Sequence, residues 1–192
     1  MRSTKMTPIL LLLLLNLAIA WPLSAQEETS LQVRSAAFLP SSPLFRKIYA
    51  DAVVSYGVEA SIPLLYRLHG WSNFDWLSKE GRSDGFNEPT DVTIANISFG
   101  IKMPYQLCSQ LRPYLGIGPT FSKIWLKNQA CCCGKHDAKW VFGGVLKAGI
   151  YCPLTDCLFI DLFADYYYQP VHFEEKVDIG GGKLGAGIGV AF

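Results

Sequence analysis

The sequence KLGAGIGVAF, Lys183–Phe192, decides the fold that we expect for this chain. Every second residue in it is apolar, and the residues between them are small or charged. Alternation with a period of two residues is typical of a β-strand with one apolar and one small or polar face. A strand that ends on an exposed aromatic residue suits a closed antiparallel barrel whose apolar face meets lipid. The alternative for these ten residues alone is a half-buried strand of a soluble β-protein.

The N-terminus predicts export from the cell. Met1–Lys5 carries two cations and no acid, and an apolar run from Ile9 to Ala20 follows it. This layout is typical of a secretory signal peptide, and so short a run does not suit a permanent transmembrane helix. We expect cleavage after Ala25, with Ala20 as the alternative. Residues 1–25 are then the signal peptide, and residues 26–192 form one barrel domain.

The charge balance excludes one class of function. Lysine and arginine number 17, aspartate and glutamate number 16, and the formal net charge is +1. A near-neutral chain without basic runs is not expected to bind nucleic acid. Beyond residue 25 the chain is rich in aromatic residues and glycine but has no apolar run that could span a bilayer as a helix. Export and this composition together favour a β-barrel.

Segments with period-two alternation follow one another along the whole domain. They leave no room for a second domain, so we predict an all-β fold, an eight-stranded antiparallel up-and-down transmembrane β-barrel. Pro119 inside one segment is expected to mark a bulge or a local kink, because proline cannot donate to a strand ladder. The predicted strands are Leu31–Leu39, Asp51–Ile62, Tyr66–Leu77, Val92–Tyr105, Arg112–Lys127, Lys139–Tyr151, Leu158–Gln169 and Lys183–Phe192.

The connections between these strands alternate in length. Short periplasmic turns and long outer loops are typical of outer-membrane barrels. We therefore expect the segments 79–91, 128–138 and 170–182 to face outside. The short connections are Pro63–Leu65, Gln106–Leu111 and Cys152–Cys157; the long ones are Pro40–Ala50, Ser78–Asp91, Asn128–Ala138 and Pro170–Gly182.

Aromatic residues on the apolar parity gather at the strand ends. Two aromatic bands at the two membrane interfaces are expected of a barrel in a bilayer. Lys123 shares the lipid-facing parity, and its position two residues before Trp125 predicts a place near the rim, where the ammonium group can reach water. The long-loop band comprises Trp76, Trp125, Trp140, Tyr166 and Tyr168, and the short-turn band comprises Tyr105 and Phe192.

Charged residues on the opposite, inward parity balance in sign. The interior of an eight-stranded barrel is only wide enough for side chains to fill it. Charges in so narrow a space are stable only when they are paired. We therefore expect a lumen charge network that closes the barrel, with a narrow ion path as the alternative. Its members are Arg34, Glu59, Asp75, Lys102, Lys147, Asp161, Asp165 and Lys183.

All six cysteines follow the signal peptide and would reach an oxidising compartment. Cys152 and Cys157 bracket a short turn and are a candidate disulfide. The short-turn and long-loop cysteines lie at opposite ends of the predicted barrel, so at least one cysteine on each side is left over. We expect the remainder to cross-link to envelope proteins. No CxxC pair is present, and we predict no metal site. The candidate cross-linking residues are Cys108, Cys131, Cys132 and Cys133.

The whole mature chain resembles the small bacterial outer-membrane β-barrels of the OmpA, OmpX and OmpW type, in layout rather than through a diagnostic motif. The resemblance implies an integral protein of the bacterial outer membrane, in contact with its lipid and inserted by the barrel-assembly machinery. Gly187, Ile188, Val190 and Phe192 would belong to the C-terminal assembly signal that the machinery reads.

The resemblance leaves the activity open. A structural or surface-interaction role, with disulfide links to envelope partners, is our first hypothesis. A narrow conduit for small or apolar solutes is the second. The third is a lipid-modifying enzyme, which would need a histidine, a serine and an acid near one rim. His136 and His172 fall in long loops without a GxSxG motif, so we predict no catalytic residue and no cofactor.

Overall fold

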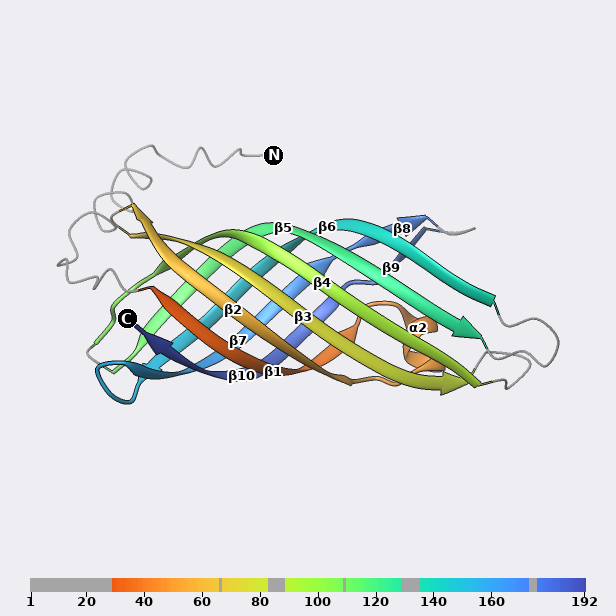
Figure 1. Ribbon diagram of the computed structural model, residues 1–192, viewed down its shortest axis with the longest axis horizontal. Coiled ribbons are helices and arrows are strands. Elements are labelled where there is room, and N and C mark those ends of the chain that lie inside the picture. The colour runs from red at the N-terminus through yellow and green to blue at the C-terminus, as the bar shows by residue number, and fades with distance from the viewer. Residues whose placement is uncertain (1–28, 66, 83–88, 109, 129–134, 173–175) are drawn as a thin grey trace, which may run out of the picture.

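The computed structural model describes residues 29–65, 67–82, 89–108, 110–128, 135–172 and 176–192. The predicted signal peptide and its cleavage site lie outside these residues. Eight antiparallel strands close into a barrel, in the order β1-β10-β7-β6-β5-β4-β3-β2 (Figure 1). The predicted all-β, eight-stranded, up-and-down barrel is confirmed. Its strands are β1 Ser30–Pro40, β2 Val53–Leu65, β3 Leu68–Arg82, β4 Pro89–Pro104, β5 Arg112–Asn128, β6 Lys135–Pro153, β7 Leu158–Tyr168 and β10 Gly181–Ala191.

The first and last strands close the barrel. β1 and β10 pair without interruption from Ser30↔Ala191 to Pro40↔Gly181. Beyond the strands, the Thr29 amide donates to the Phe192 carbonyl at 3.1 Å and the Phe192 amide donates back at 2.9 Å. The terminal strand that the alternation predicts is therefore the strand that completes the sheet, and pairing it leaves the barrel wall without a free edge.

The side chains alternate between the lumen and the outer wall. In β2, Ser55 and Glu59 point inward and are buried, whereas Tyr56 between them is 63% exposed. The same alternation puts large apolar side chains on the outer wall of every barrel strand. So large an exposed apolar surface is unfavourable in water, and it is the surface that a lipid-facing barrel requires.

Several strand ends differ from the predicted ones: β2 begins at Val53 instead of Asp51, whereas other strands are longer than predicted. β3 runs to Arg82 instead of Leu77, and β6 begins at Lys135 instead of Lys139. Backbone pairing, such as Asn128↔Lys135, continues into residues that are polar on both faces. The predicted strand ends rest on the alternation of apolar and polar residues. At the long-loop ends of these strands neither face is apolar, so the alternation stops before the backbone pairing does.

Two long connections contain structure that the sequence analysis missed. Pro40–Ala50 was expected to be a loop but includes the helix α2, Pro43–Ile48. Ser42 is its N-cap, because the Ser42 hydroxyl oxygen accepts from the Phe45 amide at 3.4 Å. The segment 170–182 includes a small hairpin of β8 (Pro170–His172) and β9 (Lys176–Asp178). Within the described residues, no helix is long and apolar enough to cross a membrane.

Pro119 lies in a continuous β5 and interrupts only one of its two ladders. On the β6 side, Pro119 pairs with Gly144 in an unbroken register. On the β4 side, pairing stops after Ser98↔Thr120 and resumes at Ile101↔Ile117 in the same register. The register is the same on both sides of the gap, so the predicted bulge is absent, and the proline leaves only a gap in the pairing with β4.

Candidate functional site: the closed lumen

All eight charged residues predicted for the lumen lie in the barrel interior. Each is at most 5% exposed. They come from β1, β2, β3, β4, β6, β7 and β10, so the closed sheet brings together side chains that are far apart in the sequence. The alternation of side chains along each strand makes these residues point inward, and the register between strands determines which of them contact one another.

Glu59 is the centre of the network. Its carboxylate oxygens lie 2.7 Å from Lys147 Nζ, 2.8 Å from Lys102 Nζ and 2.8 Å from the guanidinium of Arg34. Three cations therefore share one buried carboxylate. Such a charge is stable in the interior because both of its oxygens are paired with cations.

Arg34 joins Glu59 to the two aspartates of β7. Its guanidinium lies 3.1 Å from Asp165 Oδ2 and 3.6 Å from Asp161 Oδ2. The guanidinium also lies over the Phe163 ring, 3.4 Å from the ring centroid. Lys147 Nζ contacts Asp165 at 3.1 Å and so closes a ring of alternating charges.

Neutral side chains add hydrogen bonds to Asp161. The Tyr114 hydroxyl donates to Asp161 at 3.0 Å, and the Gln32 amide donates to the same carboxylate at 3.1 Å. These partners lie on inward positions of β5 and β1, and the alternation alone could have indicated them as polar lumen residues.

Asp75 and Lys183 form a second pair in the interior. Lys183 Nζ lies 2.7 Å from Asp75 Oδ2, which also accepts from the Tyr167 hydroxyl at 2.8 Å and from Asn73 Nδ2 at 2.8 Å. Lys183 Nζ lies 4.2 Å from the Tyr167 ring centroid. Tyr167 thus serves both charges, one through its hydroxyl and one through its ring.

Two glycines make room for this network. A Cβ atom on Gly57 would lie 2.3 Å from Asp75 Oδ1, and one on Gly187 would lie 3.1 Å from Arg34 Cγ. Both glycines occupy inward positions beside long or charged side chains. Gly187, a predicted member of the assembly signal, therefore also has a packing role inside the barrel. The other members of that signal, Ile188, Val190 and Phe192, are exposed on the outer surface.

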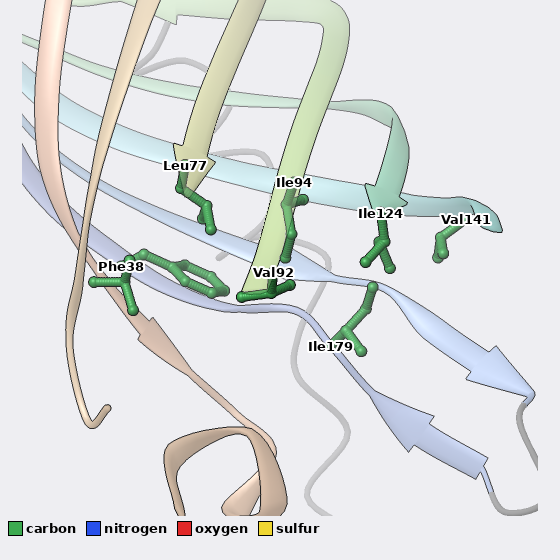
Figure 2. Packing of buried hydrophobic residues seen from close by; sticks show 8 residues of the cluster. Phe38, Leu77, Val92, Ile94, Ile124, Val141 and Ile179 are labelled. Carbon is green, nitrogen blue, oxygen red and sulfur yellow. The ribbon is translucent and has the colours of Figure 1, made fainter. Parts of the chain in front are cut away.

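Apolar side chains close the lumen at the long-loop end and form a group that was not among the predicted site residues. We call this group the mouth cluster (Figure 2). Phe45 and Tyr49 of the α2 region pack against it, and the Phe45 ring meets the Phe38 ring edge-on at 6.4 Å. The mouth cluster comprises Phe38, Val53, Leu77, Val92, Ile94, Ile124, Val141 and Ile179.

Aromatic side chains fill the short-turn end. Tyr114 and Tyr151 stack with their centroids 4.5 Å apart, and Tyr151 meets Phe159 edge-on at 5.1 Å. The Tyr151 hydroxyl oxygen also accepts a hydrogen bond from Lys102 Nζ. The charged layer thus lies between an aromatic layer on one side and the mouth cluster on the other.

The three described cysteines are free thiols, so the predicted Cys152–Cys157 disulfide is absent from this structure. The register explains why: Cys152 pairs with Ile160 across the β6–β7 hairpin, and Cys157 lies three positions away in the turn. Disulfide geometry needs closely opposed Cβ atoms. Cys131, Cys132 and Cys133 lie outside the described residues. Among the described residues, no group of metal-ligating side chains could hold an ion.

The outer wall carries the predicted aromatic residues, together with Lys123. Trp76, Trp140, Tyr166, Tyr168 and Phe192 are all exposed there. Trp76 and Trp125 lie 6.0 Å apart. Lys123 Nζ lies 5.1 Å from the ring centroids of both Trp125 and Trp140.

No protein-family model and no curated protein matches this sequence. Solved structures match over most of their length. Neisserial surface protein A is 17% identical with a TM-score of 0.64, covering 85% of this chain and 97% of that one. OprG of Pseudomonas aeruginosa is 10% identical with a TM-score of 0.66, covering 86% and 96%.

Ail of Yersinia pestis, solved with the heparin analogue sucrose octasulfate, is 12% identical with a TM-score of 0.59, covering 86% of this chain and 98% of that one. At these identities the likeness concerns the fold. In fold, the chain is similar to the eight-stranded barrels of bacterial outer membranes.

Proposed function

We propose that this protein is an integral barrel of the bacterial outer membrane, with a structural or surface-interaction role and a closed lumen. One observation carries the proposal: an apolar outer wall encloses an interior filled by paired charges and sealed by packed side chains at both ends. An apolar outer surface of this extent would be unfavourable on a soluble protein, and the packed side chains of the interior fill the space that an open pore would need.

Membrane insertion and orientation are tested together on intact cells. We expect the folded protein to migrate differently on gels before and after heating, and protease added outside to cut within the predicted outer segments 79–91 or 128–138. Membranes opened before digestion are the control for cleavage at the short turns. A protein that is released in soluble form on cell lysis would contradict the proposal.

The closed lumen predicts no steady conductance in planar bilayers. The narrow conduit is the competing hypothesis, and two variants distinguish it from a sealed barrel. If the lumen conducted ions, Asp161→Asn and Lys147→Met would change the single-channel current or its ion selectivity, because both side chains lie in the charged layer. A single-channel current that changes in these two variants would support the conduit and contradict the sealed barrel.

Disulfide links to envelope partners remain part of this proposal. Cys108 and Cys157 are exposed free thiols near the short turns, which the proposed orientation puts in the oxidising periplasm. We expect higher-mass bands on non-reducing gels that disappear on reduction and weaken in Cys108→Ser or Cys157→Ser. Monomer alone, with both thiols open to alkylation, would contradict this part of the proposal.

The lipid-modifying enzyme receives no specific support from the placement of the histidines. His69 pairs with Lys102 toward the short-turn end, whereas His136 in β6 and His172 in β8 belong to the long-loop end. The membrane lipids of a host that expresses the protein should therefore keep their acyl chains unchanged, and an altered acyl pattern would favour the enzyme.

A further inference from the structure

Lys123 is a charged residue that neither the sealed lumen nor the apolar wall explains. It lies on the outward face of β5 and is half-buried. A positive charge on the lipid-facing wall of a barrel is unfavourable, and more so the deeper it lies. A position near the rim lets the ammonium group reach water, and it also puts the group within reach of lipid head groups.

Three tryptophans frame this lysine. In one row across neighbouring strands, Trp76 is opposite Ala95, Ala95 is opposite Lys123, and Lys123 is opposite Trp140. Trp125, two residues further along β5, lies 6.0 Å from Trp76. Tryptophan is enriched at the depth of lipid head groups. The frame thus puts the ammonium group at head-group level near the long-loop end.

No carboxylate lies opposite Lys123 in the barrel wall. Its register partners are Ala95 and Trp140. The rows on either side, those of Phe121 and Trp125, contribute only uncharged partners, namely Ile97, Phe142, Thr93 and Ala138. Attraction to the tryptophan rings stabilises the ammonium group but does not neutralise its charge.

Lys127 provides the contrast within the same strand. It also has outward parity on β5, but Asp91 lies directly opposite it on β4. Lys127, which is nearer the long-loop end, thus has an acid in its own row, whereas Lys123 has only apolar and aromatic neighbours in its row. Among the described residues, the rows around Lys123 supply no anion, and a lipid head group is the anionic partner that its depth offers.

We infer that Lys123 binds the phosphate of a phosphorylated glycolipid in the outer leaflet, with Trp125 and Trp140 packing against the lipid. The phosphate supplies the charge-assisted acceptor that the wall lacks, and the indole faces suit the flat apolar surfaces of sugar rings and acyl chains. The inference rests on the proposed membrane location and adds to it a lipid class and a site.

Retention of diphosphoryl lipid A tests the inference. The protein is folded in detergent micelles, and bound lipid A is counted by native mass spectrometry as the lipid is titrated. We expect Lys123→Gln to weaken retention about tenfold, as the loss of one charge-assisted hydrogen bond predicts. Lys127→Gln is the matched control and should change retention little, whereas Lys123→Arg should keep it. Lipid A stripped of its phosphates should bind the unaltered protein as weakly as the intact lipid binds Lys123→Gln.

Equal retention of the phosphorylated and stripped lipids by the unaltered protein would overturn the inference, and that comparison needs no variant to fold. Equal retention by Lys123→Gln and the unaltered protein would overturn it as well. Heat-modifiable migration and insertion into vesicles are measured on the same preparations. Normal insertion with lipid binding that ignores Lys123 rejects only the lipid site, whereas failure to insert rejects the membrane location and the site together.

Discussion

Glu59 holds three cations within 2.8 Å, and it is 0% exposed. Replacing it with glutamine would leave Arg34, Lys102 and Lys147 buried with one anion fewer. Removing one partner of a buried ion pair costs about 3–5 kcal/mol, because the remaining charge is uncompensated. We expect Glu59→Gln to lower the free energy of unfolding by about that amount, measured by urea denaturation in detergent or vesicles.

A second substitution separates charge balance from lost packing. Lys102→Met added to Glu59→Gln removes one of the three cations and restores the equal number of charges in the lumen. The double variant should be more stable than Glu59→Gln alone, since contacting residues are not additive. A double variant that is no more stable would mean that the balance of charge does not hold the lumen together.

At the same scale, the sequence predicts which charges point into the lumen but not how they pair. The period of two assigns Arg34 and Asp161 to the interior from local pattern alone. Their contact depends on closing β1 against β10 and β10 against β7, which is a property of the register of the whole sheet. The mouth cluster had a local signal as well: Val92 and Ile94 are apolar on the inward parity near a strand end.

Among the elements, α2 lies in the connection between β1 and β2 and packs against the mouth cluster at the long-loop end of the barrel. Phe45 is half-buried against the mouth cluster, whereas Leu44 on the same helix is 52% exposed. We expect Phe45→Ala to destabilise the seal by roughly 1–3 kcal/mol, less than the ~3–5 kcal/mol of a fully buried phenylalanine. Amide hydrogen exchange should accelerate at residues 42–50 while the amides of β1 keep their protection.

Leu44→Ala is the matched control for the seal. It removes a similar apolar side chain from the same helix but one that faces away from the mouth cluster, so exchange at residues 42–50 should change little. If both variants, or neither, accelerated exchange there, Phe45 would not be the residue that anchors α2.

The elements differ in how well the sequence predicts them. The strands were predictable because a buried lumen face and an apolar outer face leave a strict alternation, as in β2. The helix α2 spans only Pro43–Ile48, so too few residues exist to show a helical period. Its signal is the cap, Ser42 followed by Pro43 at the start of the helix, which is a recognised combination.

For the whole molecule, the apolar wall predicts a depth-dependent cost of charge. Ile97 is 48% exposed on the outer face in the middle of β4, and Thr93 lies on the same face nearer the long-loop end. In a bilayer, Ile97→Arg should destabilise the barrel by about 2–4 kcal/mol and Thr93→Arg by about 0–1 kcal/mol. Reversible unfolding from lipid vesicles measures both.

The same two variants in a short-chain detergent provide the control. A micelle adapts around an added charge, so the difference between Ile97→Arg and Thr93→Arg should shrink there. Equal costs at the two positions in vesicles would contradict a bilayer centred on the middle of the barrel.

Closure by β1 and β10 also has a consequence for how the chain folds. The pairing Ser30↔Ala191 joins residues from opposite ends of the barrel sequence, so the loop that it closes is the longest in the fold. Contacts of this kind form late and slow the reaction. Until they form, both strands present unpaired backbone groups and apolar faces that favour aggregation. The chain is therefore most prone to aggregation in the interval before β10 pairs with β1. A factor that shields these two strands during that interval would raise the yield of folded protein more than any stabilisation of the finished barrel.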